Sequence, residues 1–149
     1  MIIKNGYIVA QWGDVDRVDM TFSVTKSFLS TVAGWAVDQN LLKLNDPVVN
    51  YVWDATFDGA HNSQIRWKDL LNQSSDWTGR LWGSEDWADR PPREGDVDDW
   101  KLRELQQPGT VFEYNDVRVN VLAYSLLQVL RKPLPQVLKE QIMDPIGAS

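Results

Sequence analysis

The sequence predicts a single, mainly helical α+β domain that opens with a β-hairpin. The pair Asn5-Gly6 stands between β-branched and aromatic residues, and Asn-Gly is well suited to the positive φ angles of a type I′ turn. Apolar residues recur at three- and four-residue steps over 22–40 and 116–131, which indicates two amphipathic helices. No other segment has a convincing strand pattern. We therefore expect a hairpin within 1–13 and a helical region over 20–149.

Shorter helical segments are predicted between and after the two long ones. Two short helices are expected, one from Val48 to Val52 and one from Trp67 to Leu71. A last helix is expected to begin at Pro135 and to end near Met143, because proline is favoured at the first helical position.

Composition limits the class of protein. The chain has 149 residues, a formal net charge of −6, 43% hydrophobic residues, eight Trp and no Cys. This apolar content excludes a disordered tail, and the lack of Cys excludes thiolate metal sites, so we expect neither a metal nor a cofactor. A negative charge without a Lys/Arg cluster argues against nucleic acid as a partner.

Nothing in the sequence predicts insertion into a membrane. The longest apolar runs fall far short of the roughly 20 residues that span a bilayer. The first residues, Met1 to Lys4, do not form a signal peptide, which indicates a cytoplasmic protein if this start is genuine.

The first candidate for chemistry is the segment from Ser23 to Lys26. A Ser three residues before a Lys at a helix start places a hydroxyl and an amine on one face, an arrangement that suits a nucleophile and its base. Lys26 can act as a base near neutral pH only if its surroundings lower its pKa from about 10.4. The alternative is a solvated Lys beside a capping Ser.

The second candidate is Tyr114-Asn115-Asp116, just before the helix predicted over 116–131. A phenol can relay a proton if a neighbouring cation stabilises its phenolate. The alternative is a helix N-cap at Asn115 or Asp116, preceded by a packed aromatic residue.

A Trp-rich segment over 73–99 supplies a different hypothesis. A stretch this long without regular structure is usually functional or disordered, and its tryptophans argue against disorder. Exposed faces of Trp77, Trp82 and Trp87 could stack on a sugar or a flat apolar ligand, which would make the protein a binding module. The alternative for each of them is packing in the core.

Two further polar features are interpreted as solvated loops. His61 is the only histidine, and no Gly-x-Ser-x-Gly motif accompanies it, so a Ser-His-Asp triad is disfavoured. The acidic cluster Asp96, Asp98 and Asp99 does not follow the spacing of a calcium-binding loop.

Taken together, these segments resemble the serine β-lactamases and penicillin-binding proteins, and most closely the class C β-lactamase-related esterases and amide hydrolases. The resemblance extends over most of the chain, and the 91-residue separation of Ser23 and Tyr114 fits it. The matching segments are 3–9, 22–27, 44–48, 67–75, 108–116 and 142–147.

The resemblance implies a partial β-lactamase/transpeptidase-like fold and acyl transfer on a small ester, amide or β-lactam-like substrate. Ser23 would attack the carbonyl, Lys26 would take its proton, and Tyr114 would relay a proton to the leaving group. The resemblance also implies that Asn115 and Asp116 contact substrate, and that Trp77, Trp82 and Trp87 border the cleft on its acyl side.

Two departures from the family pattern modify this expectation. No Lys-Thr-Gly or His-x-Gly motif and no further strands follow Tyr114, so we expect 1–149 to be the N-terminal part of a longer domain. Such a part would have little or no turnover alone, and its open sheet edge invites self-association. Asp116 replaces the usual Asn, which disfavours β-lactamase activity and leaves a non-catalytic, ligand-binding member of the fold as an alternative.

Overall fold

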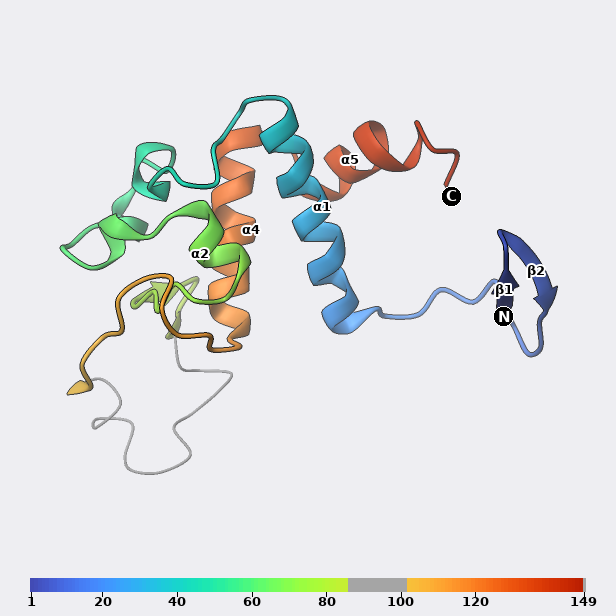
Figure 1. Cartoon of the computed structure of the whole chain (residues 1–149), viewed down its shortest axis with the longest axis horizontal. Coiled ribbons are helices and arrows are strands. Elements are labelled where there is room, and N and C mark those ends of the chain that lie inside the picture. Colours follow the sequence, from blue (N-terminus) through green and yellow to red (C-terminus); the bar gives the residue numbers. More distant parts are fainter. Residues whose placement is uncertain (86–101, 149) are drawn as a thin grey trace.

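The computed structural model describes residues 1–85 and 102–148, and its body is built from helices (Figure 1). The two long helices, α1 and α4, come from the two stretches in which the sequence has helical periodicity, and the shorter α2 and α5 pack beside them. The bounds are α1 (Thr25–Asp38), α2 (Trp67–Leu71), α4 (Asp116–Leu130) and α5 (Leu134–Leu138). Single 3₁₀ turns lie at 22–24, 48–50, 55–57 and 62–64.

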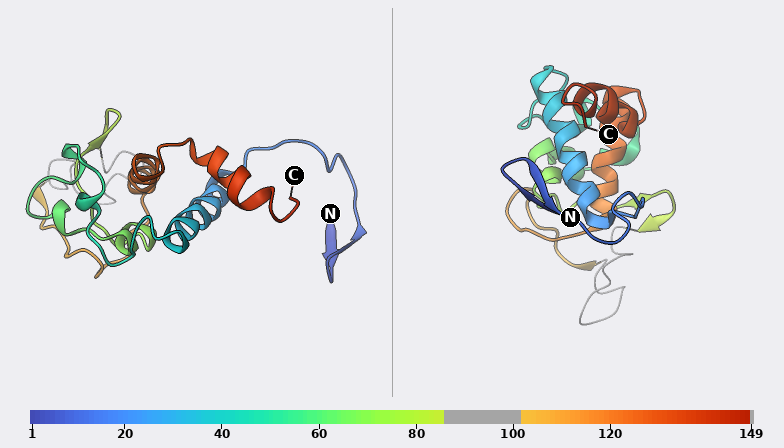
Figure 2. Two further views of the ribbon diagram at one scale, coloured as in Figure 1. Left: turned by 90° about the horizontal axis from the view of Figure 1, so that it is seen from above. Right: turned by 90° about the vertical axis from the view of Figure 1, so that its right-hand side faces the viewer.

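The predicted N-terminal hairpin is confirmed. Strands β1 (Ile2–Lys4) and β2 (Tyr7–Ala10) pair antiparallel, and the turn between them places Asn5 at φ 53° and Gly6 at φ 80°. All residues of the hairpin are exposed, and it stands apart from the helices at the end of the segment 11–21 (Figures 1 and 2).

The core lies where α1, α2 and α4 meet the loops between them. Helix α4 buries Val121 and Leu126 completely, as its apolar periodicity predicts, and α2 inserts Trp67 from the other side. Burial of these large apolar side chains is the main stabilising contribution to the body. The fully buried side chains of the cluster are Ala36, Val48, Phe57, Ile65, Trp67, Val121 and Leu126.

One prediction about local structure was wrong. A second small ribbon, β3 (Arg80–Leu81) with β4 (Ser84–Glu85), was not expected, because two-residue strands are too short to have an alternating pattern. The last helix lies where it was expected. Helix α5 begins at Leu134, one residue before Pro135, and continues directly into a π-helical turn at Lys139–Met143.

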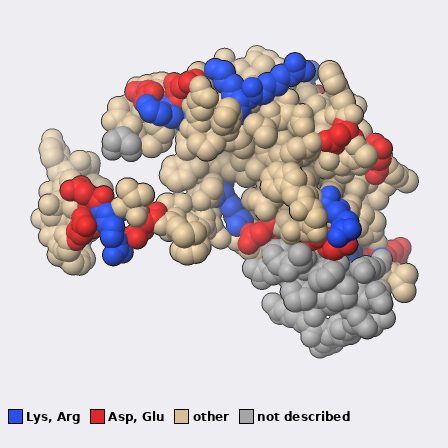
Figure 3. Space-filling view, turned by 180° about the vertical axis from the view of Figure 1, so that it is seen from behind, with Lys and Arg blue, Asp and Glu red and all other residues tan. Residues whose placement is uncertain are grey.

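The outer surface carries charges of both signs. On the face shown in Figure 3, Lys and Arg side chains lie beside Asp and Glu side chains in several small groups. Within the described part of the chain, every helix is too short or too polar to cross a bilayer.

Candidate active site

Ser23 and Lys26 lie at the entrance to α1. Ser23 belongs to a 3₁₀ turn, Phe22–Val24, that continues directly into the helix, so the two side chains share one face. Lys26 Nζ donates a hydrogen bond to Ser23 Oγ over 3.2 Å. Phe22, the residue before Ser23, has a φ of 46°. This left-handed conformation is rare for an aromatic residue, and such strained residues cluster at functional sites.

Tyr114 reaches the same point from the start of α4. The Oδ1 atom of Asn115 accepts a hydrogen bond from the backbone N of Arg118 over 2.9 Å, which makes Asn115 the N-cap. Tyr114 is the residue that precedes this cap. Tyr114 Oη lies 2.8 Å from Ser23 Oγ, and Lys26 Nζ lies 4.8 Å from the centroid of the Tyr114 ring.

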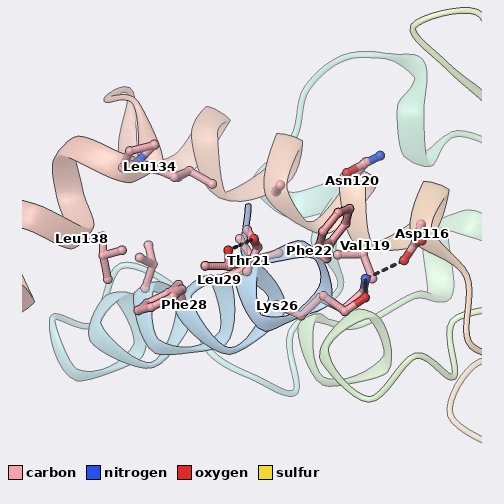
Figure 4. A pocket seen from close by; sticks show the side chains of 15 residues that line it. Thr21, Phe22, Lys26, Phe28, Leu29, Asp116, Val119, Asn120, Leu134 and Leu138 are labelled. Atoms are coloured by element: carbon pink, nitrogen blue, oxygen red, sulfur yellow. Dashed lines mark hydrogen bonds and ion pairs between the residues drawn. The ribbon is translucent and has the colours of Figure 1, made fainter. Parts of the chain in front are cut away.

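Asp116 completes the polar group through an ion pair with Lys26. The distance between Lys26 Nζ and Asp116 Oδ1 is 2.5 Å, and Figure 4 shows the two side chains directed toward each other. Partial burial lowers the pKa of Lys26, but the hydrogen bonds and charges of Asp116 and Tyr114 outweigh it and raise that pKa above its ordinary value. Lys26 is therefore held as an ammonium ion.

A groove of about 720 Å³ extends from this polar group between α1, α4 and α5 (Figure 4). Ser23, Lys26 and Asp116 lie among its lining residues, and Phe28, Leu134 and other apolar side chains line the rest. The chemistry-bearing groups thus lie beside an apolar surface, as in most small-molecule sites.

The described residues offer no cluster of three or more His, Asp or Glu side chains suited to a metal ion. The groups that meet at the site are a hydroxyl, an ammonium, a phenol and a carboxylate.

Comparison with known proteins places this arrangement in a family. The family model described as Beta-lactamase matches residues 2–149. The chain belongs to the beta-lactamase family. A Bacillus subtilis (strain 168) relative, described as "Putative penicillin-binding protein PbpX", is 26% identical over 159 residues, which cover 99% of this chain and 39% of the relative.

Solved structures of this fold agree with the helical arrangement. The hydrolase EstCE1, described as having promiscuous acyltransferase activity, is 24% identical with a TM-score of 0.57, and the match covers 84% of this chain and 36% of that one. The D-amino acid amidase of Ochrobactrum anthropi SV3 is 22% identical with a TM-score of 0.59, and the match covers 84% of this chain and 35% of the amidase chain. The chain thus spans little more than a third of the length of these relatives.

Several residues expected to contact substrate are placed elsewhere. Asn115 is 1% exposed, and its side chain is used in the helix cap. Trp77 is also 1% exposed, and its Nε1 donates to the carbonyl of Thr56 over 2.8 Å, so this indole is part of the core. Trp82 is exposed, but its ring packs edge-on against Tyr124 rather than lining the groove.

Other residues singled out in the sequence also have defined positions. His61 was expected to be solvated, but it is half-buried, and its Nε2 lies 2.9 Å from the carbonyl oxygen of Asp76. Trp87 and the acidic cluster Asp96, Asp98 and Asp99 lie outside the described residues.

A buried ion cluster that was not predicted from the sequence lies beside Tyr114. Asp76 and Arg118 are 6% and 2% exposed, and Arg118 Nη2 donates to Asp76 Oδ1 over 2.7 Å. Arg103 and Glu113 extend the cluster with further ion pairs. One signal was present in the sequence: Arg118 occupies the apolar face of α4, three residues before Val121, and a charged residue there requires a buried partner.

Proposed function

We propose that this chain carries the nucleophile of a serine hydrolase that cleaves an ester or amide through an acyl-enzyme. The supporting observation is the convergence of Ser23, Lys26 and Tyr114, in which Ser23 Oγ lies within hydrogen-bond reach of both other groups. A nucleophile in contact with two candidate proton carriers is the usual signature of covalent catalysis. Membership in the beta-lactamase family and the amidase and esterase neighbours support the same reaction class.

The reaction would proceed in two stages. Ser23 Oγ forms a bond to the substrate carbonyl carbon while its proton passes to a neutral Lys26 Nζ. Tyr114 Oη then delivers a proton to the departing alcohol or amine, so that the bond to the leaving group breaks and an ester of Ser23 remains. The proton on Lys26 passes to the Tyr114 phenolate, which restores both groups. The oxygen of a water molecule then forms a bond to the acyl carbon while a proton of the water passes to Lys26. The bond to Ser23 Oγ breaks, Oγ takes a proton from Tyr114, and Lys26 returns its proton to Tyr114 as the acid is released.

This reaction depends on the protonation state of Lys26. Lys26 accepts a proton only when it is neutral, and Asp116 favours the charged form. We therefore expect reactivity to increase with pH as Lys26 loses its proton. The Asp116 carboxylate also disfavours β-lactams as substrates. The Asn that the family usually has at this position would donate a hydrogen bond to a substrate carbonyl oxygen, whereas an ionised carboxylate can only accept one.

A fluorophosphonate probe tests the nucleophile directly, because it labels an activated serine without requiring turnover. We expect labelling at the peptide that contains Ser23, identified by mass spectrometry, and loss of the label in Ser23→Ala. Ser30→Ala is the matched control, because Ser30 lies on the same helix and bonds only to the backbone oxygen of Ser27. Labelling that survives Ser23→Ala would refute the assignment.

A second function is favoured by the ion pair of Lys26 with Asp116. If the ammonium is never lost, the chain would bind a ligand in the groove without cleaving it. This alternative predicts no fluorophosphonate label, together with ligand-induced quenching of Trp fluorescence. Burst release of p-nitrophenol from a p-nitrophenyl ester by this chain would exclude it, because a burst requires an accumulating acyl-enzyme.

A further inference from the structure

We propose that Gln73 is a positioning residue that holds Tyr114 against Ser23, an inference that rests on the proposed function. Gln73 binds the backbone on both sides of Tyr114. The backbone carbonyl oxygen of Gln73 accepts a hydrogen bond from Glu113 N over 2.8 Å. Its side-chain oxygen, Oε1, accepts a hydrogen bond from Asn115 N, also over 2.8 Å. The backbone of Tyr114 is therefore fixed at its two ends by a single residue.

The end of α2 fixes Gln73 itself. Gln73 has a φ of 53°, and Ser74 N donates to the carbonyl oxygen of Asp69 over 2.8 Å, which is the left-handed arrangement that closes many helices. Helix α2 is anchored in the core by Trp67 and Leu70, both at most 2% exposed. The support of Tyr114 thus begins in the buried core.

The buried ion cluster holds the same turn from its other end. Asp76 accepts a hydrogen bond from Gln106 N over 2.7 Å and forms the ion pair with Arg118. Arg118 Nε also donates to the carbonyl oxygen of Trp77 over 3.0 Å. Residues 73–77 are consequently bonded both to the loop before Tyr114 and to the first turn of α4.

This arrangement matters for Tyr114 because its contact with Ser23 lies near the surface of the protein. Tyr114 is half-buried and Ser23 is exposed, so the 2.8 Å contact between their oxygens depends on where the backbone places the phenol. A misplacement of about 1 Å is enough to cost a reaction on the order of a hundredfold. Loss of the bond from Asn115 N to Gln73 is expected to cause such a displacement.

Substitutions at Gln73 can separate positioning from folding. Gln73→Asn keeps an amide and suits the left-handed backbone, but it is one methylene too short to reach Asn115 N. Gln73→Glu keeps the length and an acceptor oxygen, so it should rescue the bond. Gln64→Asn is the matched control, because the side chain of Gln64 donates to the nearby carbonyl oxygen of Ala60, away from Tyr114 in the sequence.

The readout is the ¹³Cζ signal of Tyr114 in the full chain labelled with [¹³Cζ]tyrosine. Four tyrosines give four signals, and the signal lost in Tyr114→Phe identifies Tyr114. Ser23→Ala gives the position of the signal without its bond to Ser23. We expect Gln73→Asn to move the signal toward that position, while Gln73→Glu and Gln64→Asn leave it unchanged. Fluorophosphonate labelling of Ser23 is expected to slow by about tenfold or more in Gln73→Asn alone.

The outcomes distinguish this inference from the proposed function. A Tyr114 signal that is unchanged in Gln73→Asn, or equally displaced in Gln73→Asn and Gln73→Glu, overturns the positioning role. The role is also overturned if Ser23→Ala does not move the signal, because the contact would then be absent. If the signals move as expected but the wild-type chain takes no label, positioning stands and the hydrolase proposal fails.

Discussion

Lys26 Nζ and Asp116 Oδ1 are 2.5 Å apart, and this ion pair joins the first turn of α1 to the first turn of α4. The Lys26 and Asp116 side chains are 25% and 49% exposed, so solvent screens their attraction only in part. Burial opposes the charged form of Lys26, yet the carboxylate and the phenol of Tyr114 raise its pKa overall. The ion pair therefore favours the protonated form of Lys26, whereas the proposed reaction requires the neutral form.

Replacing Asp116 with Asn should make Ser23 more reactive near neutral pH. The substitution removes the charge that raises the pKa of Lys26, so a larger fraction of the amine is neutral at a given pH. We expect the rate of fluorophosphonate labelling to increase several-fold at pH 8, and its rise with pH to begin at lower pH. Asp58→Asn, at an exposed site, is the control. An unchanged pH profile in Asp116→Asn would show that the carboxylate does not govern Lys26.

Removal of the Tyr114 hydroxyl should slow the same reaction with little effect on folding. Tyr114→Phe keeps the ring over Lys26 but loses the contact with Ser23 Oγ. Because proton transfer by a positioned side chain typically contributes about a hundredfold or more, we expect a loss of this order in the labelling rate.

Tyr124→Phe is the matched control for that measurement. Tyr124→Phe likewise removes a hydrogen-bonded hydroxyl, but this one donates to the carboxylate of Asp54, and Tyr124 is not among the residues that line the groove. Equal rates in Tyr114→Phe and Tyr124→Phe would contradict a role for Tyr114.

Asp76→Asn should destabilise the fold by about 2–4 kcal/mol at pH 7, because it removes the buried carboxylate that pairs with Arg118 and leaves only the more exposed Glu113 as a charged partner. Burial disfavours the charged form of Asp76, but hydrogen bonds and charges from Arg103, Gln106 and Arg118 lower its pKa below the ordinary value. A lowered native-state pKa adds stability above the unfolded-state pKa of about 3.9, and this contribution is lost as the pH falls through the native-state value.

Urea unfolding at pH 7 and at pH 3 measures both effects. From pH 7 to pH 3, the free energy of unfolding should decrease more in the wild type than in Asp76→Asn. The decrease in Asp58→Asn should equal that of the wild type. Equal pH dependence in all three proteins would mean that Asp76 is not ionised in the fold.

Two glycine substitutions should have opposite effects on stability. Gly34 lies on the exposed side of α1, and an added Cβ would meet nothing within 4 Å, so Gly34→Ala should stabilise by about 0.5–1 kcal/mol. Gly109 has a φ of 89°, and a Cβ there would lie 2.9 Å from Arg66 Nη2 and from Asp69 Oδ1. Gly109→Ala should therefore lower the thermal unfolding midpoint, and a rise in both variants would contradict this account.

Local features of this chain were largely predictable from the sequence, because they depend on neighbouring residues. Asn5-Gly6 specified the hairpin turn through its tolerance of positive φ, and the spacing of apolar residues specified α1 and α4. The sequence also left two possible N-caps for α4, Asn115 and Asp116, and the structure assigns the cap to Asn115.

Contacts between distant segments were decided only by the tertiary structure. Ser23 and Tyr114 are 91 residues apart, and their oxygens meet because the packed helices bring two helix starts together. The role of Gln73 in holding that geometry left no local signal, because a hydrogen bond to Asn115 N has no periodicity and no characteristic spacing. Local sequence determines which elements form, whereas the positions of side chains between elements follow from how their apolar faces pack.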